Sequence, residues 1–229
     1  MINSVRSTVL SIANKNNFGY ISPADFNLYA KQAQLDLFED YFYKYSIWQA
    51  KQNARMSGSG YADVLKSLEE VIDIFSLNAN LTYGAGVYAL PSDYYLMNVI
   101  KYGNKEVEKV SNSKILNLVN SNLTAPTVNK PAYVMNGDAI TVYPSTIVSG
   151  VSSQYIRRPL DPNWTYSVII QGEPLFDQSN SDYQDFELPK SDEPSIVAKI
   201  LQYIGISIRE AELYTFANGE ETKEQQKEG

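Results

Sequence analysis

The sequence predicts an α+β protein, in which an antiparallel helical bundle carries an inserted small antiparallel β domain and ends in C-terminal helices. Three observations support this class. Apolar residues recur every three or four positions up to about residue 75, alternate with polar ones after residue 78, and return to helical spacing after residue 193. We therefore expect a helical bundle part over 1–80, a β-rich domain over 81–190, C-terminal helices over 191–217, and a flexible charged tail over 218–229.

The first part of the chain predicts three helices. A short one over 4–13 ends in the polar stretch that follows it. A long one begins at Ser22-Pro23-Ala24-Asp25, because serine suits the N-cap, proline the first helical position, and aspartate the positive end of the helix dipole. It continues to about Arg55, roughly 45 Å at 1.5 Å per residue. Beyond a glycine- and serine-rich break at 56–60, a third helix over 62–75 is expected to run antiparallel to the second.

The long helix is rich in aromatic residues, and the chain as a whole has 18 tyrosines. Its apolar positions spread around much of the helical cylinder, so they either pack within one copy of the chain or partly face a second copy. Tyrosine offers a large apolar face and a hydroxyl that tolerates water, which suits surfaces that a partner covers later.

The middle of the chain predicts strands and one short helix. Strands are expected over 87–90 and 94–102, with a bend between them, and the stretch 105–110 is expected to pair back across the turn Gly103-Asn104. A helix over 111–119 should present Ile115, Leu116 and Val119 on one side, and a polar loop should follow it to Lys130.

The clearest turn signal is Asn136-Gly137-Asp138, which predicts a tight hairpin between strands over 132–135 and 139–143. Further strands are expected over 152–158, 168–171 and 186–189. The final helical region begins at Asp192-Glu193-Pro194-Ser195 and is expected to break at Gly205 before continuing to about Phe216.

The composition excludes much of the usual catalytic chemistry. There is no cysteine and no histidine, so thiolate nucleophiles, disulfides, common zinc sites and the usual general base near neutral pH are absent. Acidic pairs at Glu39-Asp40, Glu69-Glu70 and Asp192-Glu193 lie on predicted helices or helix starts, where solvation or the helix dipole explains them. Gly84-Ala85-Gly86 lacks the lysine and the helix of a phosphate loop. We expect no enzyme, no cofactor and no metal site.

Charge and hydropathy indicate a protein that neither binds DNA stably nor enters a membrane. The net charge is −7 and the pI about 4.7, opposite in sign to a protein that neutralises phosphates. No run approaches the roughly 20 apolar residues of a membrane span, and the first twenty residues lack the apolar core of a signal peptide. The sequence predicts a soluble protein.

The order of these elements resembles the head-to-tail adaptor proteins of short-tailed bacteriophages, also called ring proteins or tail tubular protein A, including those of crAss-like phages. The resemblance covers about residues 25–213. Its marks are the bend Leu90-Pro91-Ser92-Asp93, the strand ends Tyr143-Pro144 and Arg158-Pro159, and the late helix from Glu193. Ser92 interrupts the leucine-proline-aspartate order that is typical of the family.

The resemblance implies a virion structural protein in the neck or tail, assembled in the host cytoplasm. It would form a ring of about a dozen copies, a dodecamer, that binds the portal protein on one side and downstream tail ring or nozzle proteins on the other. Double-stranded DNA would pass through the ring without specific binding. The acidic charge would line the channel or lie outside it, and the charged tail after Phe216 would become ordered against the portal or a neighbouring copy. The residues expected at interfaces are Tyr41, Tyr45, Trp48, Tyr94, Tyr95, Arg157, Arg158, Tyr214 and Phe216.

Three other functions remain open at this point. The chain is a different tail component, such as a stopper, tube or nozzle ring; it is a glycan hydrolase that uses two carboxylates; or it is a monomeric binding module. An enzyme of that kind needs two acids together in a cleft. A monomeric module predicts one molecular mass at every concentration. For Arg157 and Arg158, alternation along a strand sends the two side chains to opposite faces, so at most one belongs to any single interface.

Overall fold

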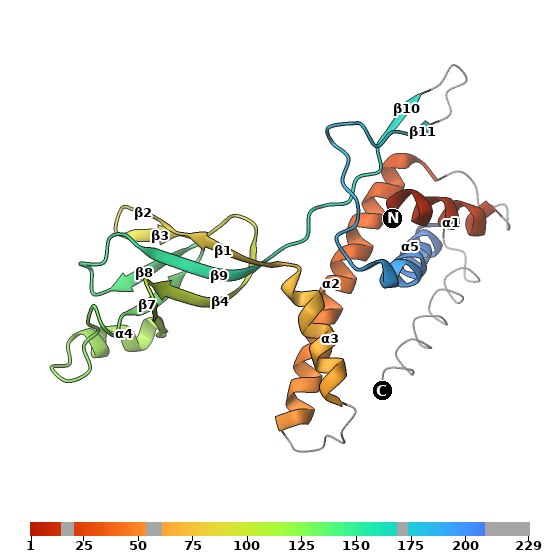
Figure 1. Cartoon of the computed structure of the whole chain (residues 1–229). Coiled ribbons are helices and arrows are strands. Elements are labelled where there is room, and N and C mark those ends of the chain that lie inside the picture. Colours follow the sequence, from red (N-terminus) through yellow and green to blue (C-terminus); the bar gives the residue numbers. More distant parts are fainter. Residues whose placement is uncertain (15–20, 54–60, 169–173, 209–229) are drawn as a thin grey trace. The chain divides into compact units, whose positions relative to one another are not determined.

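The computed structural model describes residues 1–14, 21–53, 61–168 and 174–208 (Figure 1). The chain folds into two compact units, one formed by residues 1–71 with 159–229 and the other by residues 72–158. We call them the helical unit and the β unit. The protein is thus α+β, as the sequence predicts.

The helical unit contains helices from both ends of the chain. Its elements are α1 (Ile2–Asn14), α2 (Pro23–Asn53), α3 (Tyr61–Asp73, whose last two residues belong to the β unit), β10 (Tyr166–Val168), β11 (Pro174–Phe176), η1 (Lys190–Asp192) and α5 (Glu193–Ile208). Helix α5 packs against both α1 and α2 (Figure 1). The C-terminal helix therefore completes a core that the N-terminal helices begin.

Helix α2 begins where the sequence predicts. The backbone N–H of Asp25 donates to Ser22 Oγ at 3.1 Å, and Ser22 Oγ donates in return to Asp25 Oδ2 at 2.6 Å. Ser22 thereby caps an N–H group that has no partner within the helix. Pro23 occupies the first helical position, where its missing N–H costs nothing.

The core of the helical unit is built from one apolar face of each helix. Val5 of α1, Phe26 and Phe38 of α2, and Ile200 and Ile204 of α5 are almost completely buried. Burial of each such side chain contributes about 1.5–3 kcal/mol. That gain outweighs the roughly 1 kcal/mol that a glycine costs inside a helix, so α5 continues through the buried Gly205. The break expected at Gly205 was wrong, and the segment expected to continue to Phe216 lies outside the described residues after Ile208.

The β unit contains two sheets that enclose one apolar core. Its elements are β1 (Ser76–Asn80), β2 (Thr82–Gly84), β3 (Val87–Ala89), β4 (Tyr94–Tyr102), β5 (Lys105–Glu106), β6 (Glu108–Lys109), α4 (Asn112–Val119), β7 (Ala132–Asn136), β8 (Ala139–Tyr143) and β9 (Val151–Arg157). The sheet orders are β1-β9-β4-β5 and β2-β3-β8-β7-β6, and every pair is antiparallel except β6 with β7. Tyr88 and Ile140 of one sheet share a core cluster with Ile100 and Val151 of the other.

Both predicted hairpins are present. Asn136 pairs with Ala139 across Gly137, whose φ is 59°, and Tyr102 pairs with Lys105 across Gly103, whose φ is 58°. A side chain at either glycine would be strained because L-residues rarely adopt this conformation. After β5 the chain crosses to the other sheet, so only the first part of the stretch 105–110 pairs back on β4.

Two local expectations differ from the structure. In α4 only Ile115 is buried, whereas Leu116 and Val119 are 69% and 40% exposed. The strand expected over 186–189 is absent, because this stretch pairs with no other strand. Phe186 and Leu188 are nevertheless buried. Their burial explains why apolar and polar residues alternate in this stretch although it forms no strand.

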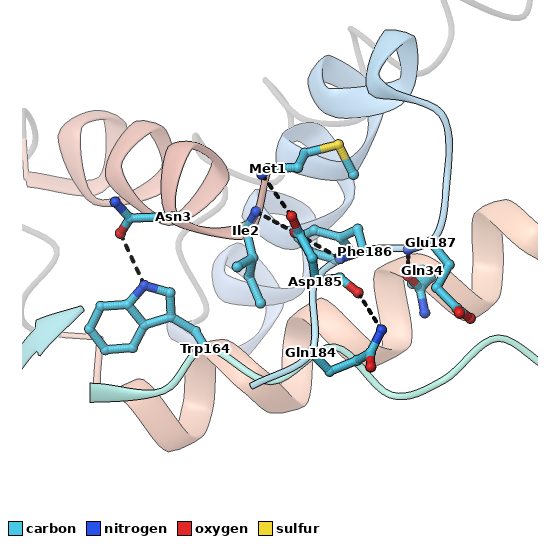
Figure 2. A network of polar contacts seen from close by, with 9 residues as sticks. All are labelled: Met1, Ile2, Asn3, Gln34, Trp164, Gln184, Asp185, Phe186 and Glu187. Carbon is cyan, nitrogen blue, oxygen red and sulfur yellow. Dashed lines mark hydrogen bonds and ion pairs between the residues drawn. The ribbon is translucent and has the colours of Figure 1, made fainter. Parts of the chain in front are cut away.

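A polar network holds the segment after β9 in the helical unit (Figure 2). Asp185 accepts hydrogen bonds from the amino group of Met1 at 2.9 Å and from the backbone N–H groups of Ile2 at 2.7 Å and Phe186 at 2.8 Å. Gln34 of α2 accepts from the Glu187 N–H at 2.9 Å and donates to the Leu160 carbonyl at 2.7 Å. These contacts explain why residues 159–190, which the sequence assigns to a β-rich domain over 81–190, belong to the helical unit instead.

Candidate interaction surfaces

The aromatic residues around Trp164 form a packed cluster in the helical unit. Trp164 is 2% exposed, its ring lies 5.6 Å from that of Tyr166 and 5.9 Å from that of Phe176, and the Arg6 guanidinium lies 3.9 Å from its centre. Its indole N–H donates to Asn3 Oδ1 at 3.1 Å (Figure 2). This cluster joins the base of the β10–β11 ribbon to α1, so these aromatic residues stabilise the fold.

The aromatic residues expected at an interface on α2 make contacts within their own copy. The hydroxyl of Tyr41 donates to Asp192 Oδ2, which ties α2 to η1 just before α5 begins. The hydroxyl of Tyr45 donates to Glu69 Oε1 at 3.2 Å, which ties α2 to α3. Tyr41, Tyr45 and Trp48 are all half-buried. Part of each ring therefore remains open to solvent, and an interface role for these residues stays a prediction.

In the β unit, Tyr94 and Tyr95 are half-buried on β4 at an irregularity of its pairing with β9. Tyr94 packs against the core cluster. The extra residue between Tyr94 and Leu96 is typical of a β-bulge, which changes the direction of the side chains beside it. The neighbouring Tyr155 is buried, and burial together with the hydrogen bond from its hydroxyl to Asp93 at 3.1 Å raises its pKa.

Arg157, the last residue of β9, and Arg158, which follows it, differ in exposure. Arg157 is half-buried; its Nη1 donates to the Arg158 carbonyl at 3.0 Å and its guanidinium lies 5.7 Å from the centre of the Phe75 ring. Arg158 is exposed, and its backbone N–H donates to the Asp93 carbonyl at 2.8 Å. Of the two, Arg158 has the more accessible side chain. Tyr214 and Phe216 lie outside the described residues.

Large apolar side chains are exposed at places that the sequence did not single out as interfaces. In the β unit, Leu116 and Val119 of α4 and Leu123 and Val128 of the following loop are 69%, 40%, 96% and 45% exposed. In the described part of the helical unit, exposed apolar side chains lie on α2, on the β10–β11 ribbon and at Leu160: Leu28, Tyr43, Leu160, Tyr166, Val168 and Leu175. Helical spacing identifies which residues share a face but not which face is covered, so the sequence signal was insufficient here.

The two units carry opposite net charge. The helical unit has 12 Lys and Arg against 21 Asp and Glu, a net charge of −9, whereas the β unit has 7 against 5, a net charge of +2. Together they make the −7 of the chain. The acidic balance of the sequence is therefore a property of the helical unit alone.

The acidic pairs lie apart on helices. Glu39 is exposed on α2 while its neighbour Asp40 lies 3.9 Å from the Lys44 ammonium, and Glu69 and Glu70 are exposed on α3. Asp192 accepts the Tyr41 hydroxyl just before α5 begins. Among the residues that the structure describes, no three His, Cys, Asp or Glu side chains gather as a metal site requires. Within the same ranges, no helix has both the length and the apolar character to cross a bilayer.

The elements that support the resemblance to phage adaptors lie at strand ends. Leu90-Pro91-Ser92-Asp93 forms the connection between β3 and β4, with the Tyr94 N–H donating to the Pro91 carbonyl at 3.3 Å, Pro144 follows the last residue of β8, and Arg158 follows the last residue of β9. Compared with known proteins, the chain matches no protein-family model and no curated protein.

Proposed function

We propose that this chain is a virion structural protein that forms a ring in the neck of a short-tailed phage and joins the portal to the tail. It acts by binding rather than by catalysis. The observation that supports this proposal most is the set of large apolar side chains left exposed on both units, notably Leu28 and Tyr43 on α2 and Leu116 and Leu123 in the β unit. Exposed apolar patches are typical of sites that a protein partner covers, and the proposal takes these side chains to be parts of such patches.

The charge distribution fits the passage of DNA through such a ring. A helical unit of net charge −9 repels phosphates when it faces a channel, so DNA passes without adhering. A ring of about a dozen copies multiplies this effect. The same reasoning disfavours stable DNA binding, which needs clustered lysine and arginine.

The proposal is tested by measuring the mass of the purified protein, alone and mixed with the portal protein, at several concentrations. A ring-forming adaptor gives a closed oligomer of high mass in at least one of the two samples. A single monomer mass in both samples would contradict the proposal and favour a monomeric binding module. Electron microscopy of intact particles then distinguishes an adaptor, which touches the portal, from a stopper, tube or nozzle ring, which does not.

The charged C-terminal segment is a second contact to test in the same samples. Residues 218–229 contain no apolar side chain and are rich in glutamate and lysine. We expect them to become ordered on the portal or on a neighbouring copy. Removal of residues after Asn218 should weaken portal attachment, and unchanged attachment would reject this part of the proposal.

A further inference from the structure

The first of two surfaces that could join neighbouring copies lies on α4 and the loop after it. It begins at Leu116, directly after the buried Ile115. Leu116 and Val119 lie three positions apart and so share one face of the helix. The loop behind them is ordered by Ser121, whose Oγ accepts from the backbone N–H groups of Leu123 at 3.4 Å and Thr124 at 3.3 Å. Leu123 is thus held with 96% of its surface exposed. A backbone that is already held by hydrogen bonds loses little entropy when a partner covers the side chain it carries.

Lysines border this surface. The Lys105 ammonium donates to Asn129 Oδ1 at 2.6 Å and approaches the Val128 carbonyl at 3.4 Å. Lys130 is exposed two positions beyond Val128. We call the surface made of Leu116, Val119, Leu123 and Val128 the α4-loop surface. Its apolar side chains adjoin a charged border beside Val128, which contains Lys105, Lys130 and the exposed Glu106 that follows Lys105. A polar rim of this kind is usual in protein interfaces.

The second surface lies on α2. Leu28 and Tyr43 are 63% and 65% exposed, and Gln32 and Glu39 between them are exposed as well. The steps of four, seven and four residues place all of them on one side of the helix. The stretch from Leu28 to Tyr43 is about 22 Å long at 1.5 Å per residue. We call this the α2 outer face; it has apolar ends and the carboxylate of Glu39 between them.

We propose that neighbouring copies of this chain join head to tail, with the α4-loop surface of one copy docked on the α2 outer face of the next. This inference rests on the ring proposed above. Contact of two α2 outer faces would place the Glu39 carboxylates of both copies in one interface, and contact of two α4-loop surfaces would place the lysines of both copies in one interface, which disfavours a two-fold pair. The head-to-tail contact instead places the border of a +2 unit against a −9 unit. Contacts of this kind generate a ring when the rotation from one copy to the next closes.

The absence of cysteine in the chain allows a direct test. Full-length Tyr43→Cys and Leu123→Cys are prepared separately, mixed under mild oxidation, and analysed for disulfide-linked dimers. We expect the mixture to give the linked dimer and each variant alone to give little. The matched controls are Val168→Cys on the β10–β11 ribbon and Val148→Cys in the β unit, two exposed apolar positions outside both surfaces.

Each outcome decides the point. Efficient linkage of Leu123→Cys to itself would show a two-fold contact and overturn the inference. Equal linkage of the two control positions, or no linkage in the Tyr43→Cys and Leu123→Cys mixture, would overturn it too. If rings are still seen by mass measurement in that case, only the inference fails. If the protein stays monomeric alone and with the portal, the proposed function fails as well.

A charge exchange measures the contribution of the border lysines. Glu39→Lys alone and the double variant Lys105→Glu with Lys130→Glu should each weaken self-association about tenfold, and the combination of all three changes should restore most of it. All three side chains are exposed, so the fold tolerates the substitutions. Weakening that the combination does not restore would contradict the proposed pairing of the two surfaces.

Discussion

Asp185 provides the sharpest test of how the two ends of the helical unit are joined. In Asp185→Asn, the amide keeps one oxygen for the N–H groups of Ile2 and Phe186 but turns an NH₂ group toward the Met1 ammonium (Figure 2). A hydrogen bond to a charged group contributes about 1.5–3 kcal/mol. The side chains of Met1 and Asp185 are 8% and 35% exposed. Solvent therefore screens part of the interaction, and we expect a loss near the lower end of this range, about 2 kcal/mol.

Thermal unfolding followed by calorimetry measures this loss. For a unit of this size, about 2 kcal/mol lowers the Tm by roughly 6–10 °C. The transition of the β unit should not move, because all partners of Asp185 lie in the helical unit. Asp182→Asn, an exposed carboxylate nearby, is the matched control and should change stability by less than about 0.5 kcal/mol.

A double-mutant cycle separates this contact from general effects. A short peptide added before Met1 moves the ammonium away from Asp185 and should cost about as much as Asp185→Asn. Because both changes remove one interaction, the two together should cost about 2 kcal/mol rather than about 4 kcal/mol. Additive losses, or no loss in either variant, would refute the reasoning.

The pH dependence of the same variant has a definite sign. Burial by itself raises the pKa of Asp185, but hydrogen bonds from the Met1 amino group and from two backbone N–H groups, with the charge of the amine, outweigh it and lower this pKa below 3.8. A lowered folded-state pKa stabilises the fold above the unfolded-state pKa and loses this effect as the pH falls through the folded-state value. The helical unit of the wild type should therefore lose more stability below pH 3.8 than that of Asp185→Asn.

Three further changes test other parts of the fold. Ser22→Ala removes the cap on the Asp25 N–H and should destabilise the helical unit by about 1 kcal/mol in denaturant unfolding, whereas an unchanged midpoint would show that the cap is unimportant. Ile140→Ala creates a cavity in the fully buried core of the β unit and should cost about 2–5 kcal/mol there, with the helical-unit transition serving as the control. Because the pKa of Tyr155 is raised in the folded state, this group stabilises the β unit below pH 10, and the stabilisation is lost as the pH rises through the folded-state pKa. Tyr155→Phe should therefore lose stability less steeply in alkali than the wild type. An identical alkaline unfolding profile of the two proteins would contradict this.

Local features of the fold were predictable because short-range chemistry determines them. The cap at Ser22 and the positive φ of Gly137 depend on neighbouring residues, and the strand at 94–102 lies between two turn signals that are local as well. The prediction of a short strand at 186–189 was wrong because a local pattern cannot show whether a partner strand is present. Burial of Phe186 and Leu188 produces a strand-like alternation, although no partner strand lies beside them.

The candidate surfaces show the limit of this reasoning. The predicted interface residues Tyr41 and Tyr45 have hydroxyls that bond to Asp192 and Glu69 of the same copy. Leu116 was placed by helical spacing on the same side as Ile115, yet Ile115 is buried and Leu116 is exposed. Spacing gives the relative direction of two side chains, while burial depends on where the rest of the chain lies.

The sequence by itself determined the α+β class, most helix and strand limits, and the lack of cysteine and histidine chemistry, since these follow from composition and from periods of two and 3.6 residues. Only the tertiary structure decided that residues 159–190 join the helices, through Asp185 and Gln34, and that the negative charge belongs to one unit. Contacts between residues more than a hundred positions apart leave no local pattern in the sequence. They exist because the folded chain brings a carboxylate to an amine and an amide to a backbone N–H group, and so satisfies polar groups that folding removes from water.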